Sequence, residues 1–593
     1  MTQFQFDLVV HATHEAGLKV GGIGAVLDGL LGQPSYNSAV RRTILVGTFD
    51  AWNGLEMEQL YAPRNGFKPL YSAHNGVYDV AEELARALSQ VEMGYQVRLL
   101  YGTRRFGTFA HEVLLVDPQG ASADASNDLK FYLWEKHGID SRRYDRYDEY
   151  QRYLKAATPG FAALQALNRF PLSVRSESPG RAVMLAHEWL GLPLIFCAQR
   201  QQPAAYRTVF YAHETATVRP LVEGHPGHDT RFYNAMYAAR ARGLSLPDVF
   251  GDQHANYKHA LLLAAAACDG IFAVGDLVVD ELRFLSPAYR SREIALVYNG
   301  VPSERSMPED RERSKQRLQQ YIQNLFGFRP SWVFTHVTRM VSSKAMWRDV
   351  RVLEQLDSEL ARRGETAALI TLSSAVPAGR RSEDVWRWEA EYGWPLLHRG
   401  DNGDLVSDEW PYYSAIQRFN QAAHASRIVL VNQFGWSRER CASRMPAEME
   451  FADIRQGSDL EFGQSIYEPF GIGPVEPLYA GALCCLSSVC GCVGFIHKRG
   501  GTNFANLVVA DYVSLPAPFA GLTLDQILSI GKSDRDIVET QTARRVAMNS
   551  ATRLPRTEHA THALMAIGYA LSTQLSWAVV VKELLLPALE RLF

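Results

Sequence analysis

An α/β fold with two doubly wound parallel sheets is predicted by three features of the sequence. The chain has 593 residues, which is more than one hydrophobic core normally supports. Short apolar runs rich in β-branched residues recur along it, and segments with helical periodicity separate many of them. Strands that alternate with helices indicate parallel sheets rather than sandwiches or bundles. The runs are too numerous for one such sheet, so two sheets are expected.

The predicted strands fall into two groups that follow one another along the chain. The first group comprises residues 6–12, 43–47, 97–101, 113–116, 182–186, 208–211, 270–274 and 295–298. The second group comprises residues 332–335, 367–371, 427–431, 482–486 and 507–510. Residues 80–90 and 352–363 are two of the helices expected between strands.

The junction between the two domains is placed after an Asn-Gly-Val-Pro turn at residues 299–302. Ser306 and Glu309 then form a capping-box pattern around Pro308, and a charged helix follows. One face of this helix is apolar and consists of Leu318, Ile322, Leu325 and Phe326. The predicted organisation is a first domain at 1–305, a linker helix at 306–330 and a second domain at 331–575. Residues 576–593 form a C-terminal helix that could cross back to the first domain.

The composition excludes several classes of protein. The chain has 61 basic and 64 acidic residues and a formal charge of −3, so nucleic acid and anionic membranes are not expected partners. Its first residues lack the basic and apolar regions of a signal peptide, and no apolar run approaches the roughly 20 residues of a membrane span. Four of the seven cysteines crowd residues 484–492 without the paired spacing of a zinc site. They are interpreted as buried small side chains, with metal binding as the alternative, in a cytoplasmic protein.

A glycine-rich turn, HEAGLKVGGIG at residues 14–24, follows the first predicted strand. The backbone amides of Gly21 and Gly22 and the start of the next helix could bind an anion, and Lys19 could add a charge for a diphosphate. A turn that only allows close packing of strand and helix fits the same residues. The spacing is neither that of a nicotinamide fingerprint nor that of a P-loop.

Two histidine-glutamate pairs follow predicted strands of the first domain. A His-Glu-Trp sequence begins at His187 after strand 182–186, and a His-Glu pair begins at His213 after strand 208–211. Ligands of open parallel sheets bind outside the carboxyl ends of the strands, so substrate contact is predicted, with structural histidines as the alternative. Arg219, six residues after His213, is a candidate phosphate contact.

The second domain opens with a strand that leads to Arg339 and, five residues later, Lys344. Arginine binds phosphate oxygens with two parallel hydrogen bonds, and lysine adds a second positive charge beside a leaving diphosphate. This spacing alone is common by chance.

The most specific pattern is SIYEPFGIGPVEPLYAG at residues 465–481. Glu468 and Glu476 stand eight positions apart, on either side of a Pro-Phe-Gly turn. Glu468 can reach a sugar from the loop, and Glu476 can bind a ribose diol from the start of a helix. A pair of glutamates favoured only by the helix dipole would explain the charges but not the turn between them.

This Glu-x7-Glu segment resembles that of retaining GT-B glycosyltransferases, and the motifs together resemble glycogen and starch synthases. KVGGIG is similar to their Lys-x-Gly-Gly loop, and AHEWLGLP at 186–193 to their acceptor-side motif. YAHETATVR at 211–219 is similar to the His…Arg segment of the animal and fungal glycogen synthases. VYNGV at 297–301 matches their turn before the interdomain linker. The resemblance runs in order from about residue 10 to about residue 500.

The resemblance implies a GT-B fold of two Rossmann-like domains facing a cleft. It implies transfer of glucose, with retention, from UDP-glucose or ADP-glucose to an α-1,4-glucan. In this scheme Arg339 and Lys344 hold the diphosphate and stabilise its leaving charge. Lys19 and the amides of Gly21 and Gly22 close on it from the first domain.

The other implied roles concern the two sugars. Glu468 contacts the donor glucose, Glu476 the ribose, and His213 lies beside the anomeric carbon. The residues predicted to carry catalysis are therefore Glu468, His213, Arg339 and Lys344. Further donor-side candidates are Arg219, Asn299, Pro469, Phe470 and Gly471, and the acceptor-side candidates are His187, Glu188 and Trp189. Neither a cofactor nor a metal is implied, and the Asp-x-Asp pair Asp534 and Asp536 is interpreted as solvated surface charge.

Several departures from the family pattern leave alternatives open. Ala345 replaces the usual glycine after the motif lysine, and the segment 438–464 reads as an insertion unlike either group of synthases. The Arg339–Lys344 spacing resembles the bacterial and plant enzymes rather than the animal and fungal ones. The donor nucleotide, the acceptor, allosteric control and the oligomeric state, including a homo-oligomer, stay open. A small-acceptor enzyme of the sucrose- or trehalose-phosphate-synthase type and a non-catalytic glycan-binding relative are the alternatives.

Overall fold

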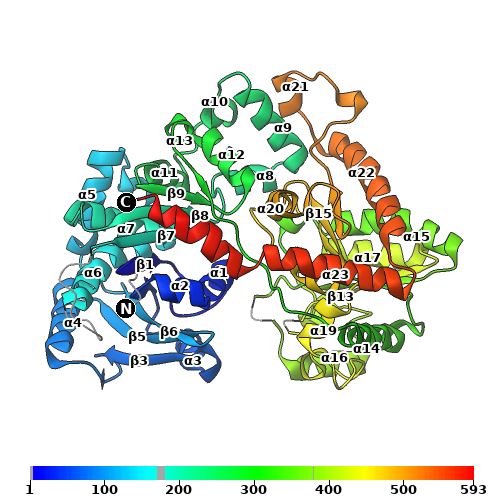
Figure 1. Ribbon diagram of the computed structural model, residues 1–593, viewed down its shortest axis with the longest axis horizontal. Helices are drawn as coiled ribbons and strands as arrows, with labels where there is room; N and C mark the ends of the chain where they lie inside the picture. The colour runs from blue at the N-terminus through cyan, green and yellow to red at the C-terminus, as the bar shows by residue number, and fades with distance from the viewer. Residues whose placement is uncertain (1–4, 170–179, 378, 434) are drawn as a thin grey trace. The chain divides into compact units, whose positions relative to one another are not determined.

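The chain forms two α/β units, each with its own sheet (Figure 1). The computed structural model describes residues 5–169, 180–377, 379–433 and 435–593. Unit 1 comprises Met1–Val218, Leu244–Gly300 and Trp577–Phe593, and unit 2 comprises Arg219–Gly243 and Val301–Ser576. Each unit is built on its own sheet, which confirms the predicted fold class.

Unit 1 has a ten-stranded sheet in the order β10-β9-β8-β7-β1-β2-β6-β5-β3-β4. The strands from β10 to β6 in this order pair in parallel, whereas β5, β3 and β4 extend the sheet with antiparallel pairs. The strands are β1 Leu8–Ala12, β2 Thr43–Thr48, β3 Phe67–Ser72, β4 Val77–Tyr78, β5 Arg98–Phe106, β6 Phe109–Asp117, β7 Ala182–His187, β8 Arg207–Ala212, β9 Gly270–Ala273 and β10 Ala295–Leu296.

The antiparallel edge of unit 1 differs from the parallel sheet expected from the sequence. Gly107, at a φ of 61°, lies in the tight turn that joins β5 to β6, so these strands pair directly without a crossover helix. The strand β3 was not predicted, because Lys68 and Pro69 interrupt its apolar pattern.

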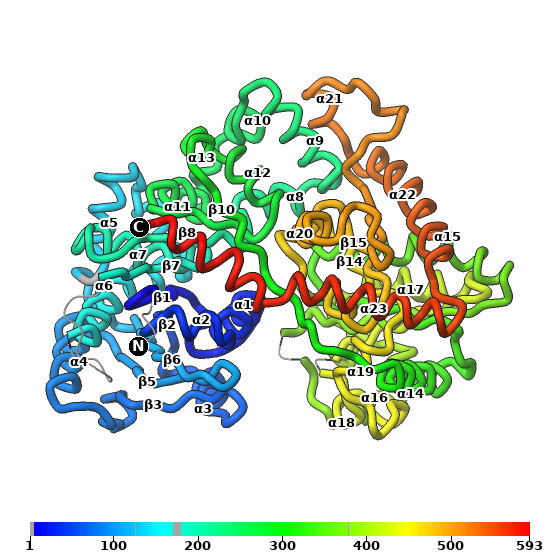
Figure 2. The backbone as a smooth tube through the Cα atoms, in the orientation of Figure 1, coloured from blue at the N-terminus to red at the C-terminus, as the bar shows by residue number. Residues whose placement is uncertain are grey.

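The helices of unit 1 connect these strands. They are α1 Gly22–Leu31, α2 Pro34–Ala39, α3 Gly54–Tyr61, α4 Glu82–Tyr95, α5 Asp124–His137, α6 Asp148–Arg169, α7 Glu188–Gln201, α10 Leu246–Phe250, α11 Tyr257–Ala265, α12 Asp276–Leu285 and α13 Pro287–Arg290. The C-terminal segment, with α24 Trp577–Val579 and α25 Leu586–Glu590, also belongs to unit 1 (Figure 2). Its last residue, Phe593, stacks near Phe6 and under the guanidinium groups of Arg181 and Arg207.

Unit 2 has a six-stranded parallel sheet in the order β13-β12-β11-β14-β15-β16. Its strands are β11 Trp332–Val337, β12 Ala367–Leu372, β13 Ser426–Val431, β14 Leu460–Gly463, β15 Leu483–Ser487 and β16 Leu507–Ala510. The chain leaves β11 toward β12 on one side and returns to β14 on the other. The strand order therefore reverses between β11 and β14, which is where open α/β sheets bind ligands. The segment 438–464, expected to be an insertion, contributes the central strand β14.

The helices of unit 2 include the segment predicted to be a linker. They are α8 Val218–Glu223, α9 His228–Arg240, α14 Pro308–Phe326, α15 Trp347–Arg363, α16 Ser382–Tyr392, α17 Trp410–Ala422, α18 Arg438–Cys441, α19 Phe451–Gln456, α20 Gly491–Gly500, α21 Leu524–Leu528, α22 Lys532–Arg553 and α23 Glu558–Gln574. The predicted apolar face of α14 is buried, and its Arg311 donates hydrogen bonds to the carbonyls of Gln456 and Ser458. The capping box is not formed: the N-cap is Met307, and the buried Ser306 hydroxyl has no partner within the described ranges.

The stretch Arg219–Gly243 belongs to unit 2, whereas the sequence placed it in the first domain. Its Asp229 forms an ion pair with Arg348 of α15, at 2.7 Å, and both side chains are fully buried. Arg348 also pairs with the buried Glu539 of α22, at 2.9 Å. These contacts join residues more than a hundred positions apart, so no local pattern could show them.

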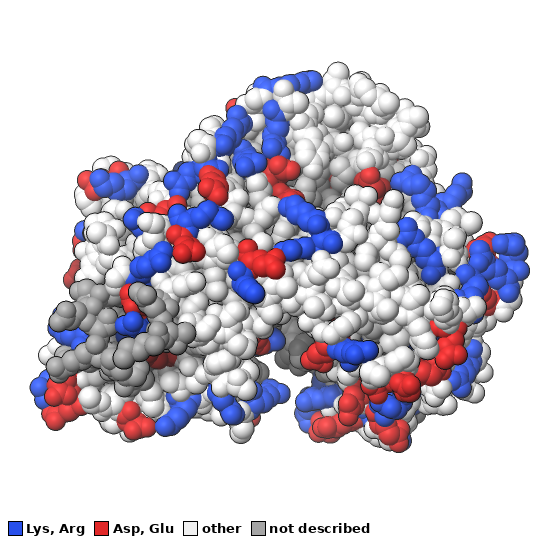
Figure 3. Space-filling view, viewed as in Figure 1, with Lys and Arg blue, Asp and Glu red and all other residues white. Residues whose placement is uncertain are grey.

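The cysteines lie in the interior of the units, and charged side chains lie on the surface. All seven cysteines are buried and free. Acidic and basic side chains are interspersed where α14 and α16 lie on the face shown in Figure 3. Within the part of the chain that the structure covers, none of the helices combines the length and the apolar character that crossing a bilayer requires.

Candidate active site

The candidate site in unit 2 lies at the switch point between β11 and β14. The loop after β11 carries Arg339 and Lys344, and the loop after β14 carries residues 464–472. Because neighbouring parallel strands end at the same edge of a sheet, two motifs more than a hundred residues apart meet there.

Lys344 and Glu468 form an ion pair at this edge. The Ser465 hydroxyl donates a second hydrogen bond to the same carboxylate, at 3.2 Å. The side chains of Lys344 and Glu468 are 18% and 12% exposed, so the pair is sheltered but reachable. The sequence predicted both residues, and the structure brings them together.

The turn Pro469-Phe470-Gly471 is fixed by the start of α20. The amide of Gly491 donates to the carbonyl of Glu468 at 3.0 Å, and the amide of Cys492 donates to the carbonyl of Phe470 at 2.8 Å. Gly471 has a φ of 86°, a conformation that favours glycine. These contacts hold the backbone of Glu468 in one place.

Replacing Gly491 by alanine is expected to displace this turn. A Cβ at Gly491 would lie 1.8 Å from the carbonyl oxygen of Pro469, so the backbone must move. We expect nucleotide affinity, measured by calorimetry, to fall by about tenfold or more. Gly94 of α4 provides the control, because a Cβ there meets nothing within 4 Å. Equal affinities of the Gly491→Ala and Gly94→Ala variants would contradict a role for the turn.

Two further basic residues accompany Lys344. The guanidinium of Arg219 lies 5.0 Å from the ring centroid of Tyr467, and its Nη1 lies 3.4 Å from the Ser343 hydroxyl. Arg339 is exposed, and its guanidinium has no hydrogen-bond or ion-pair partner among the described residues. The predicted Arg219 therefore joins the loop of Lys344, although it precedes β11 by more than a hundred residues.

Glu476 contacts a residue that the sequence did not reveal. Arg455 of α19 pairs with Glu476 at 2.5 Å and with the buried Glu461 at 3.2 Å. Burial raises the pKa of Glu461, and Arg455 opposes that rise. Arg455 lies in the segment expected to be an insertion, where its spacing gave no signal. Glu476 remains 27% exposed on its other side.

The glycine-rich turn of unit 1 is organised by an internal carboxylate. Glu15 accepts hydrogen bonds from the amides of Val20 and Gly21, at 2.7 and 2.6 Å. Lys19 pairs with Asp28 at 2.9 Å and is about half exposed. The carboxylate of Glu15 thus occupies the turn. The amide of Gly21, a predicted phosphate contact, already donates its hydrogen bond to Glu15. Gly22 opens α1 with free space around it, since a Cβ there meets nothing within 4 Å.

The three predicted acceptor residues are buried in unit 1. His187, Glu188 and Trp189 are 0%, 5% and 4% exposed. Trp189 packs against the rings of Tyr153 and Tyr257. The structure thus encloses all three side chains within unit 1, and their contact with an acceptor stays a prediction.

Glu188 shapes the loop that carries His213. Its carboxylate accepts hydrogen bonds from the amides of His213 and Glu214, at 2.5 and 2.7 Å. Its φ of 64° is rare for a residue with a side chain and is costly to hold. Glu188 therefore fixes the backbone of the loop that carries His213.

His213 lies at the end of a row of three histidines. The Nδ1 atom of His187 lies 2.9 Å from Nε2 of His213, and the Nε2 atom of His187 lies 2.8 Å from Nδ1 of His11. Burial lowers the pKa of His213 to about 3, with His14 contributing, and holds the pKa values of His11 and His187 well below 6.5. All three imidazoles are neutral near neutral pH.

This row makes the stability of the protein sensitive to acid. In the unfolded chain the histidines bind protons below their ordinary pKa of 6.5, whereas in the folded chain they do not. Stability is therefore lost as the pH falls through that value, by about 1.4 kcal/mol per histidine at one unit below it. Urea unfolding at pH 7.5 and 5.5 should show this loss. In a His213→Gln variant the loss should be smaller by about that amount, and an unchanged loss would contradict the neutral state of His213.

Two other predicted features have defined places. Asn299 is buried, and its Oδ1 atom has no hydrogen-bond partner in the described part of the chain. In the Asp-x-Asp pair, Asp534 accepts from the amide of Gly531, and Asp536 pairs with Arg351 and Lys532. Both aspartates lie in the first turns of α22, where their charges are engaged.

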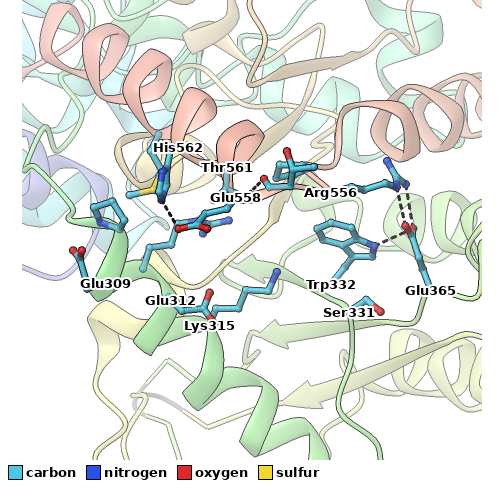
Figure 4. Close-up of a pocket in the computed structure, with 15 residues that line it drawn as sticks. Glu309, Glu312, Lys315, Ser331, Trp332, Glu365, Arg556, Glu558, Thr561 and His562 are labelled. Atoms are coloured by element: carbon cyan, nitrogen blue, oxygen red, sulfur yellow. Dashed lines mark hydrogen bonds and ion pairs between the residues drawn. The ribbon is translucent and has the colours of Figure 1, made fainter.

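Unit 2 also has a cavity of about 810 Å³ that none of the predicted site residues line (Figure 4). It lies between α14 and α23. Trp332 donates a hydrogen bond to Glu365, which also pairs with Arg556 at 2.7 Å. Glu309 and Glu312, which also line the cavity, form no ion pair with any residue that the structure describes.

No family model and no curated protein matches the sequence. Solved structures resemble it in fold. Trehalose-6-phosphate from E. coli bound with UDP-2-fluoro glucose has a TM-score of 0.50 at 10% identity, over 99% of each chain. The α,α-trehalose-phosphate synthase (UDP-forming) from Burkholderia vietnamiensis has a TM-score of 0.49 at 12% identity, over 99% of this chain and 97% of that one. The catalytic domain of Starch Synthase IV from Arabidopsis thaliana, bound to ADP and acarbose, has 0.48 at 12% identity, over 93% and 100%.

At such identities the likeness concerns the fold alone. The similarity to the E. coli structure extends over nearly the whole of both chains. With the two sheets described above, it confirms the predicted GT-B fold of two Rossmann-like units.

Proposed function

We propose that the chain is a retaining glycosyltransferase that transfers glucose from a nucleoside-diphosphate glucose. The observation that carries the proposal is the sheltered pair of Lys344 and Glu468 at the switch point of unit 2. A lysine there can meet a leaving diphosphate, and a carboxylate can bind the hydroxyl groups of the transferred sugar. The ligand of the E. coli structure, UDP-2-fluoro glucose, is of this chemical class.

Each residue of the unit 2 site has a proposed role in this reaction. Lys344, Arg219 and Arg339 neutralise the diphosphate, which carries increasing charge as the bond from C1 of glucose to its oxygen breaks. Glu468 orients the glucose, and Glu476, held by Arg455, binds the ribose diol. The acceptor oxygen attacks C1 on the face that the diphosphate leaves, and its proton passes to a phosphate oxygen. Positioning and electrostatics supply the rate enhancement, without a protein nucleophile.

The acceptor has two candidates. An α-1,4-glucan is proposed from the resemblance to glycogen and starch synthases. The burial of His187, Glu188 and Trp189 favours the second candidate, a small acceptor such as a sugar phosphate, because the motif expected to bind a glucan chain is enclosed. The proposed donor is UDP-glucose or ADP-glucose, and the two are compared in the experiment below.

Nucleotide release tests the proposal. UDP-glucose and ADP-glucose are each incubated with the protein alone, with glycogen, or with glucose 6-phosphate, and without added metal. Release that depends on glycogen supports the glucan synthase, and release that depends on glucose 6-phosphate supports the small-acceptor enzyme. Anomeric retention is then read from the product by NMR. A folded protein that neither binds nor hydrolyses either donor would contradict the proposed function.

A further inference from the structure

The row of three histidines crosses three adjacent strands of unit 1, β1, β7 and β8, and consists of His11, His187 and His213. His11 of β1 pairs in register with Leu185 of β7, and His187 lies two residues further along β7. His187 pairs with Tyr211 of β8, and His213 lies two residues further. Because side chains alternate along a strand, steps of two keep the three rings on one face of the sheet.

The rings are joined edge to edge into one chain of hydrogen bonds. The ring centroids of His11 and His187, and of His187 and His213, are 5.1 Å apart in both pairs. At the inner end, Nε2 of His11 lies 3.0 Å from the Tyr36 hydroxyl, which lies 3.0 Å from the Thr43 hydroxyl. His11, His187 and Tyr36 are fully buried, and only His213 is partly exposed. These hydrogen bonds therefore lead from the interior of unit 1 to the carboxyl edge of its sheet.

Proton counting leaves this chain only two complete arrangements. Each neutral imidazole has one N–H donor and one acceptor nitrogen. If Tyr36 donates to His11, each histidine carries its proton on Nδ1 and donates toward His213. If Tyr36 accepts from His11, each histidine carries its proton on Nε2, and the Nδ1 atom of His213 is a bare acceptor. The Nδ1 atom of His213 makes no hydrogen bond with any residue that the structure describes.

The acidity of the groups selects between the two arrangements. A phenol O–H is a better hydrogen-bond donor than the N–H of a neutral imidazole, whereas an imidazole nitrogen is a better acceptor than a phenol oxygen. Tyr36 is thus the donor, and Thr43 is left to donate to Tyr36. The buried end of the chain dictates the hydrogen-bonding character of its exposed end.

We propose that Tyr36, His11 and His187 are positioning residues that fix the proton of His213 on Nδ1, so that His213 presents a hydrogen-bond donor to its ligand. In the proposed reaction, on which this part of the inference rests, that ligand is a sugar oxygen. His187 then acts through His213 and not on the acceptor. None of the three positioning residues can touch a substrate, because their side chains are buried.

The position of the proton can be measured directly. Long-range ¹H–¹⁵N correlation spectra of protein labelled with ¹⁵N-histidine distinguish the two tautomers, and spectra of His11→Gln, His187→Gln and His213→Gln variants assign the signals. We expect all three histidines to carry the proton on Nδ1. Protonation of His213 on Nε2 would overturn the proposal. This readout does not depend on any enzymatic activity.

Tyr36→Phe tests the control from the interior, and Tyr150→Phe is its matched control. Tyr150 is also buried in unit 1, and its hydroxyl lies 2.8 Å from the Ser141 hydroxyl, outside the histidine row. We expect Tyr36→Phe to shift a measurable part of His213 to the Nε2 tautomer and to lower kcat by about tenfold, with the donor KM little changed. Tyr150→Phe should leave both unaltered. Identical tautomers in the two variants would overturn the proposal.

A milder variant keeps the test decisive if Tyr36→Phe does not fold. Thr43→Val removes only the hydroxyl that donates to Tyr36 and should cause a smaller shift in the same direction. If the tautomer of His213 were unchanged in this variant, the proposed control of His213 through Tyr36 would be contradicted. If the tautomers are as expected but neither donor is turned over, the proposed function fails and the proton arrangement stands. If turnover occurs with His213 protonated on Nε2, the reverse holds.

Discussion

Replacing Glu468 by glutamine is expected to lower kcat by about 10²- to 10³-fold while the protein stays folded. Glutamine keeps the size of the side chain and can still accept from Ser465, but it loses the charge that faces Lys344. The steady-state rate of nucleotide release measures the effect, and thermal unfolding verifies the fold. A variant with more than about a third of the parent rate would remove Glu468 from the site.

Replacing Lys344, the partner of Glu468, tests the same ion pair from its other side. Lys344→Met should lower kcat by a similar factor, because one stabilising charge on the leaving diphosphate is lost. Since the two groups contact one another, their effects should not add. The Lys344→Met, Glu468→Gln double variant should be about as slow as the slower single variant. Full additivity would show that the pair does not act as one unit.

The second large effect concerns stability. Arg348→Met is expected to lower the free energy of unfolding of unit 2 by about 3–5 kcal/mol. The change leaves the carboxylates of Asp229 and Glu539 buried without their partner. It also removes hydrogen bonds to the carbonyls of Gln464 and Ser465, at 3.1 and 3.3 Å, just before Glu468. Chemical unfolding measures the loss.

Arg351, one turn further along α15, provides the control for Arg348. It pairs with Asp536 and Glu539, but its side chain is 26% exposed. Water replaces much of what such a pair provides, so Arg351→Met should cost no more than about 1 kcal/mol. Equal losses in the two variants would show that burial of Arg348 does not decide the effect.

Local patterns in the sequence predicted most of the sheets and the central pair of the site. Apolar runs marked the strands of both units, and the Glu-x7-Glu segment marked Glu468. Lys344 was found from its distance to Arg339. These signals survive because a strand, a turn and the residue that ends them are adjacent in the chain.

The features that the sequence did not reveal are contacts between strands and helices that are far apart in the sequence. The role of His187 depends on the pairing of β7 with β1 and β8, and a row of three rings exists only in that register. Arg455 reaches Glu476 from a segment whose central strand, β14, was hidden in an expected insertion. Likewise, the membership of Arg219–Gly243 in unit 2 rests on the buried Arg348. Contacts of this kind are set by tertiary packing, which no short window of sequence contains.

The division of the chain into interleaved stretches also bears on how the protein is made. The backbone passes between the two units after Val218, Gly243, Gly300 and Ser576. On a ribosome, unit 1 therefore cannot be completed until residues 577–593 have been made, because Trp577 packs against Gly29 and Gly300, and Phe593 against Phe6. Most of unit 2 is synthesised while unit 1 still lacks its final segment. Completing unit 1 thus includes a contact between Phe6 and Phe593, which are far apart in the sequence, and closing so long a stretch of chain is entropically costly.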